Sequence, residues 1–181
     1  ARVQAFMAGA CQVIDMAVLE GREDVAQRLI GVARQLSQRK EGKEFRPTIK
    51  RYQAEIEALA ARRGQIGEAK KTLASNPDDP TANRQMGYWH CLSEGDWDQG
   101  LSCLAKGDDA EIRELAKNDL EPPPTRPEEQ VERAAMWWAV AEKRHAAEQD
   151  LPAIRAGYWY EHARPNLPDG SKVALWGVAD P

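Results

Sequence analysis

The chain has 181 residues, of which 42% are hydrophobic and 30% charged, and these values exclude an intrinsically disordered protein. Residues 1–71 carry 14 Lys and Arg against 9 Asp and Glu, a balance of +5, whereas residues 72–181 carry 11 against 20, a balance of −9. A nucleic-acid-binding domain is usually much more basic than this, so we expect two solvated helical faces of opposite sign and no nucleic-acid partner.

The first half of the chain shows apolar residues every three to four positions, a spacing typical of α-helices. The expected apolar stripes are Val3, Phe6/Met7, Ala10, Ile14 and Ala17; Val25, Leu29, Val32 and Leu36; Ile49, Tyr52, Ile56 and Leu59; and Ile66, Ala69 and Leu73. We expect Gly21 to end the first helix and Gly64 the third, whose first turn tolerates Pro47. The polar residues 38–42 end the second helix, and residues 76–80 end the fourth.

Helical spacing continues through the second half. Five helices are expected, and their apolar residues or ranges are Ala82, Met86 and Trp89; Trp97 to Lys106; Ile112, Leu115/Ala116 and Leu120; Val131, Ala134/Ala135, Trp138 and Ala141; and Leu151, Ile154, Tyr158 and Trp159. The first of these helices ends at Gly95, Asp108 or Asp109 caps the third, and the last starts near Asp150. The proline-rich residues 121–127 predict a loop. The single strand candidate, residues 172–176, is too short to change an all-α class.

Three expected pairs of helices share a turn pattern, in which a small residue follows a glycine by five places and an apolar residue follows the small residue by about four places. The three sets are Gly21, Ala26 and Leu29/Ile30; Gly64, Ala69 and Leu73; and Gly95, Gly100 and Leu104. This pattern resembles the tetratricopeptide repeat, a helix–turn–helix unit of about 34 residues. The best copy spans residues 81–114, although successive turn glycines are 43 and 31 residues apart.

The resemblance implies an all-α fold of antiparallel helical hairpins stacked as a tetratricopeptide-like α-solenoid. We expect hairpins over residues 1–120, a loop over 121–127, and an aromatic-rich helix pair over 128–181 packed on the same solenoid. In the best copy, Gly100 would lie at a close contact between two helices, and Trp97 would be buried at the hairpin elbow.

A second resemblance covers residues 81–175. It rests on Gly95-Asp96-Trp97, Gly100-Leu101, Leu104-Ala105-Lys106-Gly107-Asp108-Asp109, Leu115-Ala116, Asp119-Leu120, Trp137-Trp138, Ala141-Glu142 and Arg155-Ala156-Gly157-Tyr158-Trp159-Tyr160-Glu161-His162-Ala163. Together these segments resemble an uncharacterised helical module of planctomycete-type bacterial proteins, often attached to carbohydrate-binding, lectin-like or kinase-like domains. The resemblance implies a helper or scaffold role and brings no catalytic residues.

Sequence motifs for chemistry are absent: we find no nucleophile elbow, phosphate-binding glycine loop or zinc-protease motif. Cys11, Cys91 and Cys103 are widely spaced at apolar helical positions, which predicts core filling rather than a zinc site. Glu142 and His145 form one Glu-x-x-His pair, a quarter of a di-metal site. No carboxylate is expected on an apolar run that would raise its pKa for acid–base chemistry. We therefore predict a protein that is not an enzyme, with no metal and no cofactor.

The function expected from this pattern is a scaffold domain of a larger protein that binds a protein or peptide. By repeat position, the partner-binding residues on a concave face would be Arg51, Ala54, Gln85 and Trp89. Nine of the twelve aromatic residues lie between Tyr88 and Trp176, so they either pack the last helix pair or are exposed. Exposed Trp and Tyr would favour the alternative, a carbohydrate-associated accessory module.

The compartment stays open, because the first residues contain neither an initiator Met nor the apolar core of a signal peptide. We therefore interpret the sequence as a trimmed or processed chain of either a cytoplasmic or an exported protein. We also find no run of about 18 apolar residues, and expect no membrane-spanning segment.

Overall fold

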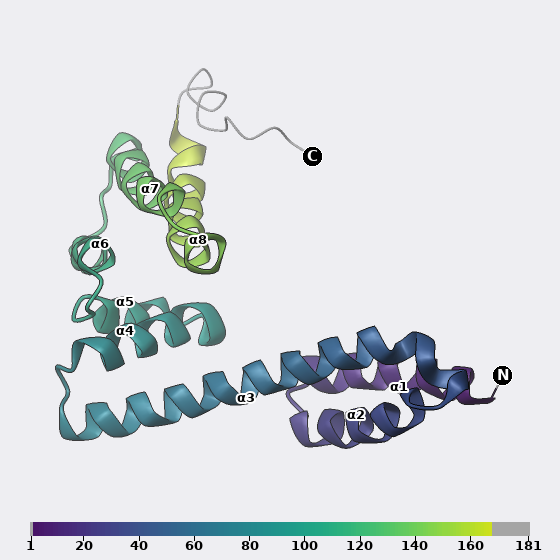
Figure 1. The fold of residues 1–181 in the computed structure, drawn as a ribbon. Helices are drawn as coiled ribbons and strands as arrows, with labels where there is room; N and C mark the ends of the chain where they lie inside the picture. The colour runs from purple at the N-terminus through teal and green to yellow at the C-terminus, as the bar shows by residue number, and fades with distance from the viewer. Residues whose placement is uncertain (1, 168–181) are drawn as a thin grey trace. The chain divides into compact units, whose positions relative to one another are not determined.

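The computed structural model describes residues 2–167, without the side chains of Ala146 and Ala147 (Figure 1). Every regular element in this range is helical, which confirms the all-α class; the strand candidate at 172–176 lies outside the described residues. The elements are α1 (Arg2–Leu19), α2 (Glu23–Ser37), the 3₁₀ helix η1 (Lys40–Phe45), α3 (Arg46–Ser75), α4 (Pro80–Trp89), the π-helix η2 (His90–Glu94), α5 (Trp97–Leu104), α6 (Ala110–Leu120), α7 (Pro127–Glu142), α8 (Ala146–Ala163) and the 3₁₀ helix η3 (Arg164–Asn166).

Two compact units divide the chain at Gln65 and Ile66, so that α3 contributes to both. The core of the first unit consists of Met7, Ile14 and Ala17 from α1, Ala26, Ile30 and Ala33 from α2, and Ile49, Tyr52 and Ile56 from α3. The stripe expected on α1 is confirmed, with Met7 rather than Phe6 turned inward.

The stripe expected on α2 is wrong by one residue. Ala26, Ile30, Ala33 and Ser37 are buried, whereas Val32 is exposed and the other three expected residues are only half-buried. Adjacent residues point about 100° apart around a helix, so residues 25, 29, 32 and 36 form one column of side chains along α2 and residues 26, 30, 33 and 37 form the next. Both columns contain apolar residues. The column with two alanines faces the core, because small side chains allow neighbouring helices to approach closely.

The helix end expected at Gly64 is wrong, because α3 runs unbroken through Gly64 for 30 residues. Gly64 does not have the positive φ that ends many helices, whereas Gly21 and Gly95 have φ of 68° and 69°. Its neighbours Arg62, Arg63 and Gln65 are strong helix formers and outweigh the weak preference of one glycine. The hairpin expected at residues 49–73 is therefore absent, and stacking as a solenoid stays a prediction.

A Gly64→Ala substitution tests this correction directly. Because alanine costs less conformational entropy in a helix interior, we expect the free energy of unfolding to rise by about 0.5–1 kcal/mol in thermal melts followed by circular dichroism. The control is Gly21→Ala, which should be destabilising because its φ of 68° is unfavourable for alanine. A loss of stability for Gly64→Ala as well would indicate a turn at residue 64.

The second unit begins with the helical hairpin of α4 and α5, where the repeat pattern is clearest. Asp79 caps α4 by accepting from the N–H of Ala82 at 2.9 Å, and Asp96 caps α5 by accepting from the N–H of Gln99 at 3.0 Å. Between the two helices, η2 ends at Gly95 in the left-handed conformation. Residues 94–101 therefore form the turn that the sequence predicts.

Gly100 lies where α5 crosses the preceding helical segment, as expected. A Cβ atom built on it would lie 2.2 Å from Sγ of Cys91 and 3.2 Å from the carbonyl oxygen of Gly87. Gly87 is equally confined, because its Cβ would lie 2.6 Å from Cγ of Leu104. The two glycines allow the backbones of α4 and α5 to approach each other.

A Gly100→Ala substitution should therefore lower the free energy of unfolding by about 1–3 kcal/mol through overpacking against Cys91, as measured by urea denaturation. Gly157→Ala in α8 is the matched control, since a Cβ there meets nothing within 4 Å. We expect that control to be neutral or slightly stabilising. Equal stability of both variants would contradict the close approach of α4 and α5.

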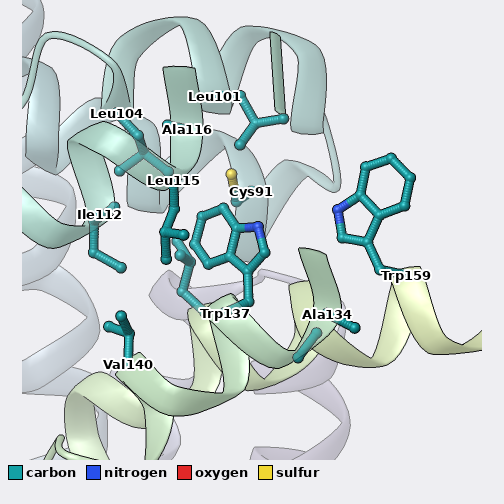
Figure 2. Close-up of a cluster of buried hydrophobic side chains, with 12 residues drawn as sticks. Cys91, Leu101, Leu104, Ile112, Leu115, Ala116, Ala134, Trp137, Val140 and Trp159 are labelled. Atoms are coloured by element: carbon teal, nitrogen blue, oxygen red, sulfur yellow. The ribbon is translucent and has the colours of Figure 1, made fainter. Parts of the chain in front are cut away.

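The main core of the second unit joins α5 and α6 to α7 and α8, and Trp137 lies at its centre (Figure 2). The sequence indicates Trp138 as the inward residue of α7, but Trp137 is fully buried and Trp138 only half-buried. Three other residues expected to be buried, Leu120, Ile154 and Tyr158, are exposed. Helix α8 also begins at Ala146, ahead of the expected start near Asp150.

Candidate interaction surfaces

The four residues expected on a partner-binding face belong to two different units. Arg51 and Ala54 are exposed on α3 in the first unit, three positions apart and so on one side of the helix. Gln85 and Trp89 are half-buried on α4 in the second unit, four positions apart. Each pair shares a helical face, and a single surface formed by all four stays a prediction.

Trp89 is held by its neighbours on both its apolar and its polar side. The ring packs against a cluster of Ile66, Ala69, Ala82 and Met86. Its indole N–H donates to Oε1 of Glu94 at 2.9 Å, while Oε2 of Glu94 lies 2.5 Å from Nδ1 of His90. Both hydrogen bonds lower the pKa of Glu94, and the hydrogen bond from Trp89 has the larger effect. The contacts fix Trp89 to η2 and give it a structural role.

A buried ionic cluster joins α6, α7 and α8 around Asp119, whose side chain is 0% exposed. Its carboxylate accepts from Nε of Arg155 at 2.6 Å and from the indole N–H of Trp159 at 3.0 Å. Nε of Arg133 lies 3.7 Å from the same carboxylate. Asp119 continues the apolar stripe of Ile112, Leu115 and Ala116 along α6. That position was the signal in the sequence.

Arg155 also connects the ionic cluster to three aromatic rings. Its guanidinium carbon lies 5.0 Å from the ring centroid of Trp97, 4.3 Å from that of Tyr158 and 5.4 Å from that of Trp159. Trp97 is half-buried rather than fully buried as expected, and the guanidinium of Arg155 lies over its ring. The cluster therefore stabilises the packing of α8 against α5 and α6, and its carboxylate is paired with guanidinium groups.

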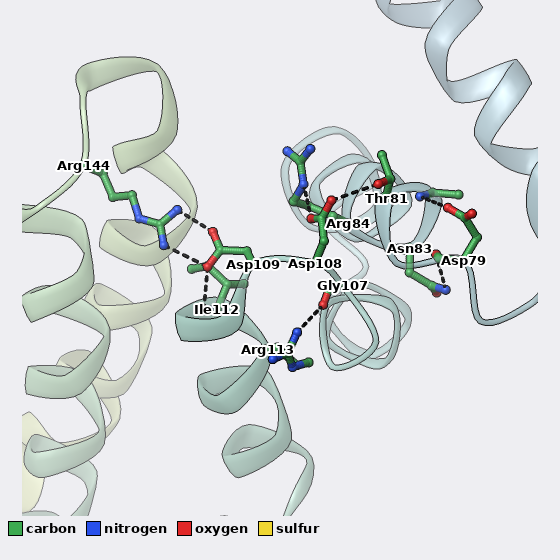
Figure 3. Close-up of polar contacts among 11 residues, drawn as sticks. Asp79, Thr81, Asn83, Arg84, Gly107, Asp108, Asp109, Ile112, Arg113 and Arg144 are labelled. Atoms are coloured by element: carbon green, nitrogen blue, oxygen red, sulfur yellow. Dashed lines mark hydrogen bonds and ion pairs between the residues drawn. The ribbon is translucent and has the colours of Figure 1, made fainter.

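A second polar network centres on the loop of Gly107, Asp108 and Asp109 (Figure 3). Asp108 accepts from Nε of Arg84 at 2.5 Å and from the hydroxyl of Thr81 at 2.9 Å, both on α4. Asp109 caps α6 and pairs with Arg144, which follows α7. The hydrogen bonds of Arg144 are the main cause that lowers the pKa of Asp109. This loop thus links α4 to α7.

Helix α1 presents apolar side chains on two sides. One stripe completes the core of the first unit, while Phe6, Val13, Met16 and Leu19 are 46%, 45%, 57% and 86% exposed. By length and composition alone α1 is also apolar enough to cross a membrane, as core helices and signal sequences often are. This composition does not test whether α1 crosses a membrane, and the expectation of no membrane-spanning segment stays a prediction. The side chains Phe6, Val13 and Met16 lie along one side of α1 and form an exposed apolar stripe.

A shallow groove of about 270 Å³ lies between α2 and α3 in the first unit. Its lining combines Ile30, Gly31 and Ile56 with the polar residues Gln27, Arg34, Gln53 and Glu57. Small-molecule sites usually enclose about 300–1,000 Å³ and bury most of the ligand. The groove is therefore smaller and more open than most small-molecule sites.

The cysteine side chains follow the core-filling prediction. Cys91 is buried, and burial raises the pKa of its thiol to about 12; burial also raises the pKa of Cys11 and Cys103. Such thiols stay protonated at neutral pH and are poor nucleophiles. Within residues 2–167, no three His, Cys, Asp or Glu side chains are grouped so that they could hold a metal ion.

Comparison with known proteins gives no match: no family model, no curated protein and no solved structure is detectably similar to the chain. The resemblances to the tetratricopeptide repeat and to the planctomycete-type module stay predictions.

Proposed function

We propose that this chain is a non-catalytic scaffold domain that binds another protein through the outer face of α1. The observation that carries the proposal is the exposed apolar stripe of Phe6, Val13 and Met16, which lies about 100° around α1 from the stripe that fills the core. Exposed apolar side chains that line up along one helix are typical of helix-to-helix recognition. The stripe is continuous with polar residues at both ends, Arg2 and Glu20, as in many protein interfaces.

The polar clusters of the second unit support the same proposal, because their contacts are those of a structural framework. Asp119, Asp109 and Glu94 each have basic or indole partners within hydrogen-bonding distance. A general base or nucleophile needs a lone pair that faces a substrate. These carboxylates thus serve to connect or cap helices.

The carbohydrate-associated alternative has weaker support among the described residues. A sugar platform needs an exposed aromatic face, whereas Trp137 and Trp159 are buried and Trp89, Trp97 and Trp138 are half-buried. Tyr158 is exposed, but its ring centroid lies 4.1 Å from that of His162, and Arg155 lies over the ring. The aromatic residues of the second unit mainly pack its helices together.

Affinity capture from an extract of the source cells, followed by mass spectrometry, tests the proposal. We expect a defined partner protein to be retained by the parent chain and lost with Val13→Glu. The control, Ala8→Glu, puts the same charge on an exposed position of α1 outside the stripe and should retain the partner. Capture that ignores Val13→Glu would contradict the assignment of α1. Glycan binding that disappears with Tyr158→Ala would favour the alternative.

A further inference from the structure

The outer stripe of α1 has the spacing of a coiled-coil seam. Its positions are Arg2, Phe6, Gly9, Val13, Met16 and Glu20, which follow one another by alternating steps of four and three residues. Each of these residues is exposed. The N–H of Glu20 donates to the carbonyl oxygen of Met16 at 2.9 Å, so helical geometry continues to the last position. Steps that average about 3.5 residues keep side chains on the seam between two packed helices.

Resting on the proposed function, we infer that the partner of this seam is α1 of a second copy of the chain, packed antiparallel. In such a pair, each layer joins residues at equal distances from the middle of the helix. Phe6 then lies opposite Met16, Gly9 opposite Val13, and Arg2 opposite Glu20. Every contact occurs twice about a two-fold axis, so the assembly closes as a dimer.

Side-chain sizes favour the antiparallel orientation. A Cβ atom built on Gly9 meets nothing within 4 Å, so the space above it is open. The branched side chain of Val13 from the second copy would fill that space. A parallel pair would instead place Gly9 opposite Gly9 and leave a gap at the middle of the seam. Gaps in a packed interface lose the dispersion contacts that stabilise it.

Charge favours the same orientation. An antiparallel pair places Arg2 near Glu20 at both ends, whereas a parallel pair places Arg2 opposite Arg2 and Glu20 opposite Glu20. Glu20 forms an ion pair with Arg22 at 3.9 Å, with both side chains more than half exposed, so it can accept a closer partner. Opposite charges across a seam select the partner and its orientation.

A second copy also fits α1 better than a lipid bilayer does. The inner stripe of Met7, Ala10, Ile14 and Ala17 is buried in the first unit. Inserting α1 into a membrane would remove these side chains from the core, whereas an antiparallel dimer uses only the face that is exposed. Asp15 would in addition be costly in hydrocarbon.

Sedimentation equilibrium of the 181-residue chain over a range of concentrations is the first test. We expect a monomer–dimer equilibrium whose dissociation constant rises by about 100-fold or more with Val13→Glu, because two charges would be buried without partners. Ala8→Glu should leave the constant unchanged. Thermal melts of both variants confirm that each stays folded. A chain that is monomeric at all concentrations, or a dimer indifferent to Val13→Glu, would overturn the inference.

The orientation is tested by charge exchange. Glu20→Arg should raise the dissociation constant about three- to ten-fold, since a surface ion pair lost at each end is a small contribution. The double variant Arg2→Glu with Glu20→Arg should restore the parental value. In a parallel dimer the single substitution only replaces one repulsive pair with another, so an unchanged constant would overturn the antiparallel arrangement.

Further outcomes separate this inference from the proposed function. A monomeric chain that captures a different protein through Val13 would overturn the dimer and leave the scaffold function standing. A dimer that captures no other protein would support the inference and identify the partner of the scaffold as a second copy of the chain, whereas a chain that neither dimerises nor captures a protein would contradict both proposals. Flotation of a monomeric chain with vesicles of phosphatidylcholine and phosphatidylglycerol, lost with Val13→Glu, would assign the stripe to lipid and overturn the dimer.

Discussion

An Asp119→Asn substitution is expected to lower the free energy of unfolding by about 3–5 kcal/mol, because it removes the counter-charge of the buried Arg155 and of the partly buried Arg133. The side chains of Arg155 and Arg133 are only 9% and 15% exposed, so neither can be rehydrated without opening the packing of α6, α7 and α8. The amide keeps the shape of the carboxylate, so the loss reports on charge rather than on a cavity. We therefore expect this to be among the largest effects of any conservative change in the chain.

Urea denaturation followed by tryptophan fluorescence measures this effect in the second unit, since all six tryptophans lie between residues 89 and 176. Asp150→Asn is the matched control, because Asp150 is exposed on α8, and its change should stay within about 0.5 kcal/mol. If Asp119→Asn cost no more than this control, the two arginines would have other partners and the ionic cluster would not hold the helices together.

A Trp137→Ala substitution should likewise cost about 3–5 kcal/mol, since the indole is fully buried at the centre of the second unit (Figure 2). It packs in one cluster with Leu104, Ile112, Leu115 and Val140, which come from three different helices. Truncation would leave a cavity that these side chains can fill only in part. The expected result is a large fall in the urea midpoint, or an insoluble variant.

Two comparisons make this second prediction informative even when the alanine variant does not fold. Trp138→Ala should cost clearly less, because Trp138 is half-buried. Trp137→Phe should also cost less, since it keeps a ring and removes an indole N–H that is buried without a hydrogen-bond partner among the described residues. The opposite ranking of Trp137→Ala and Trp138→Ala would show that α7 faces the core with the other tryptophan.

Local features of the chain were readable from sequence alone. The stripe of α1, the loop at residues 76–80 and the α4–α5 turn around Gly95 and Gly100 depend on interactions within a few residues of one another. Helical periodicity, capping of α6 by Asp109 and the turn at Gly95 are such local properties. They do not depend on the rest of the molecule, so the sequence predicts them correctly.

Only the tertiary structure decided which apolar column of a helix faces the core and which polar residues meet. On α2 and α7, adjacent columns are both apolar, so the partner helices choose Ala26 over Val25 and Trp137 over Trp138. Gly64 is compatible with either a turn or a helix, and α3 takes the helix. The sequence determined the helical class and the local turns, because these follow from short-range preferences. The Asp119 cluster and the exposed face of α1 required the fold, because they depend on which residues distant in sequence pack together and which are left uncovered.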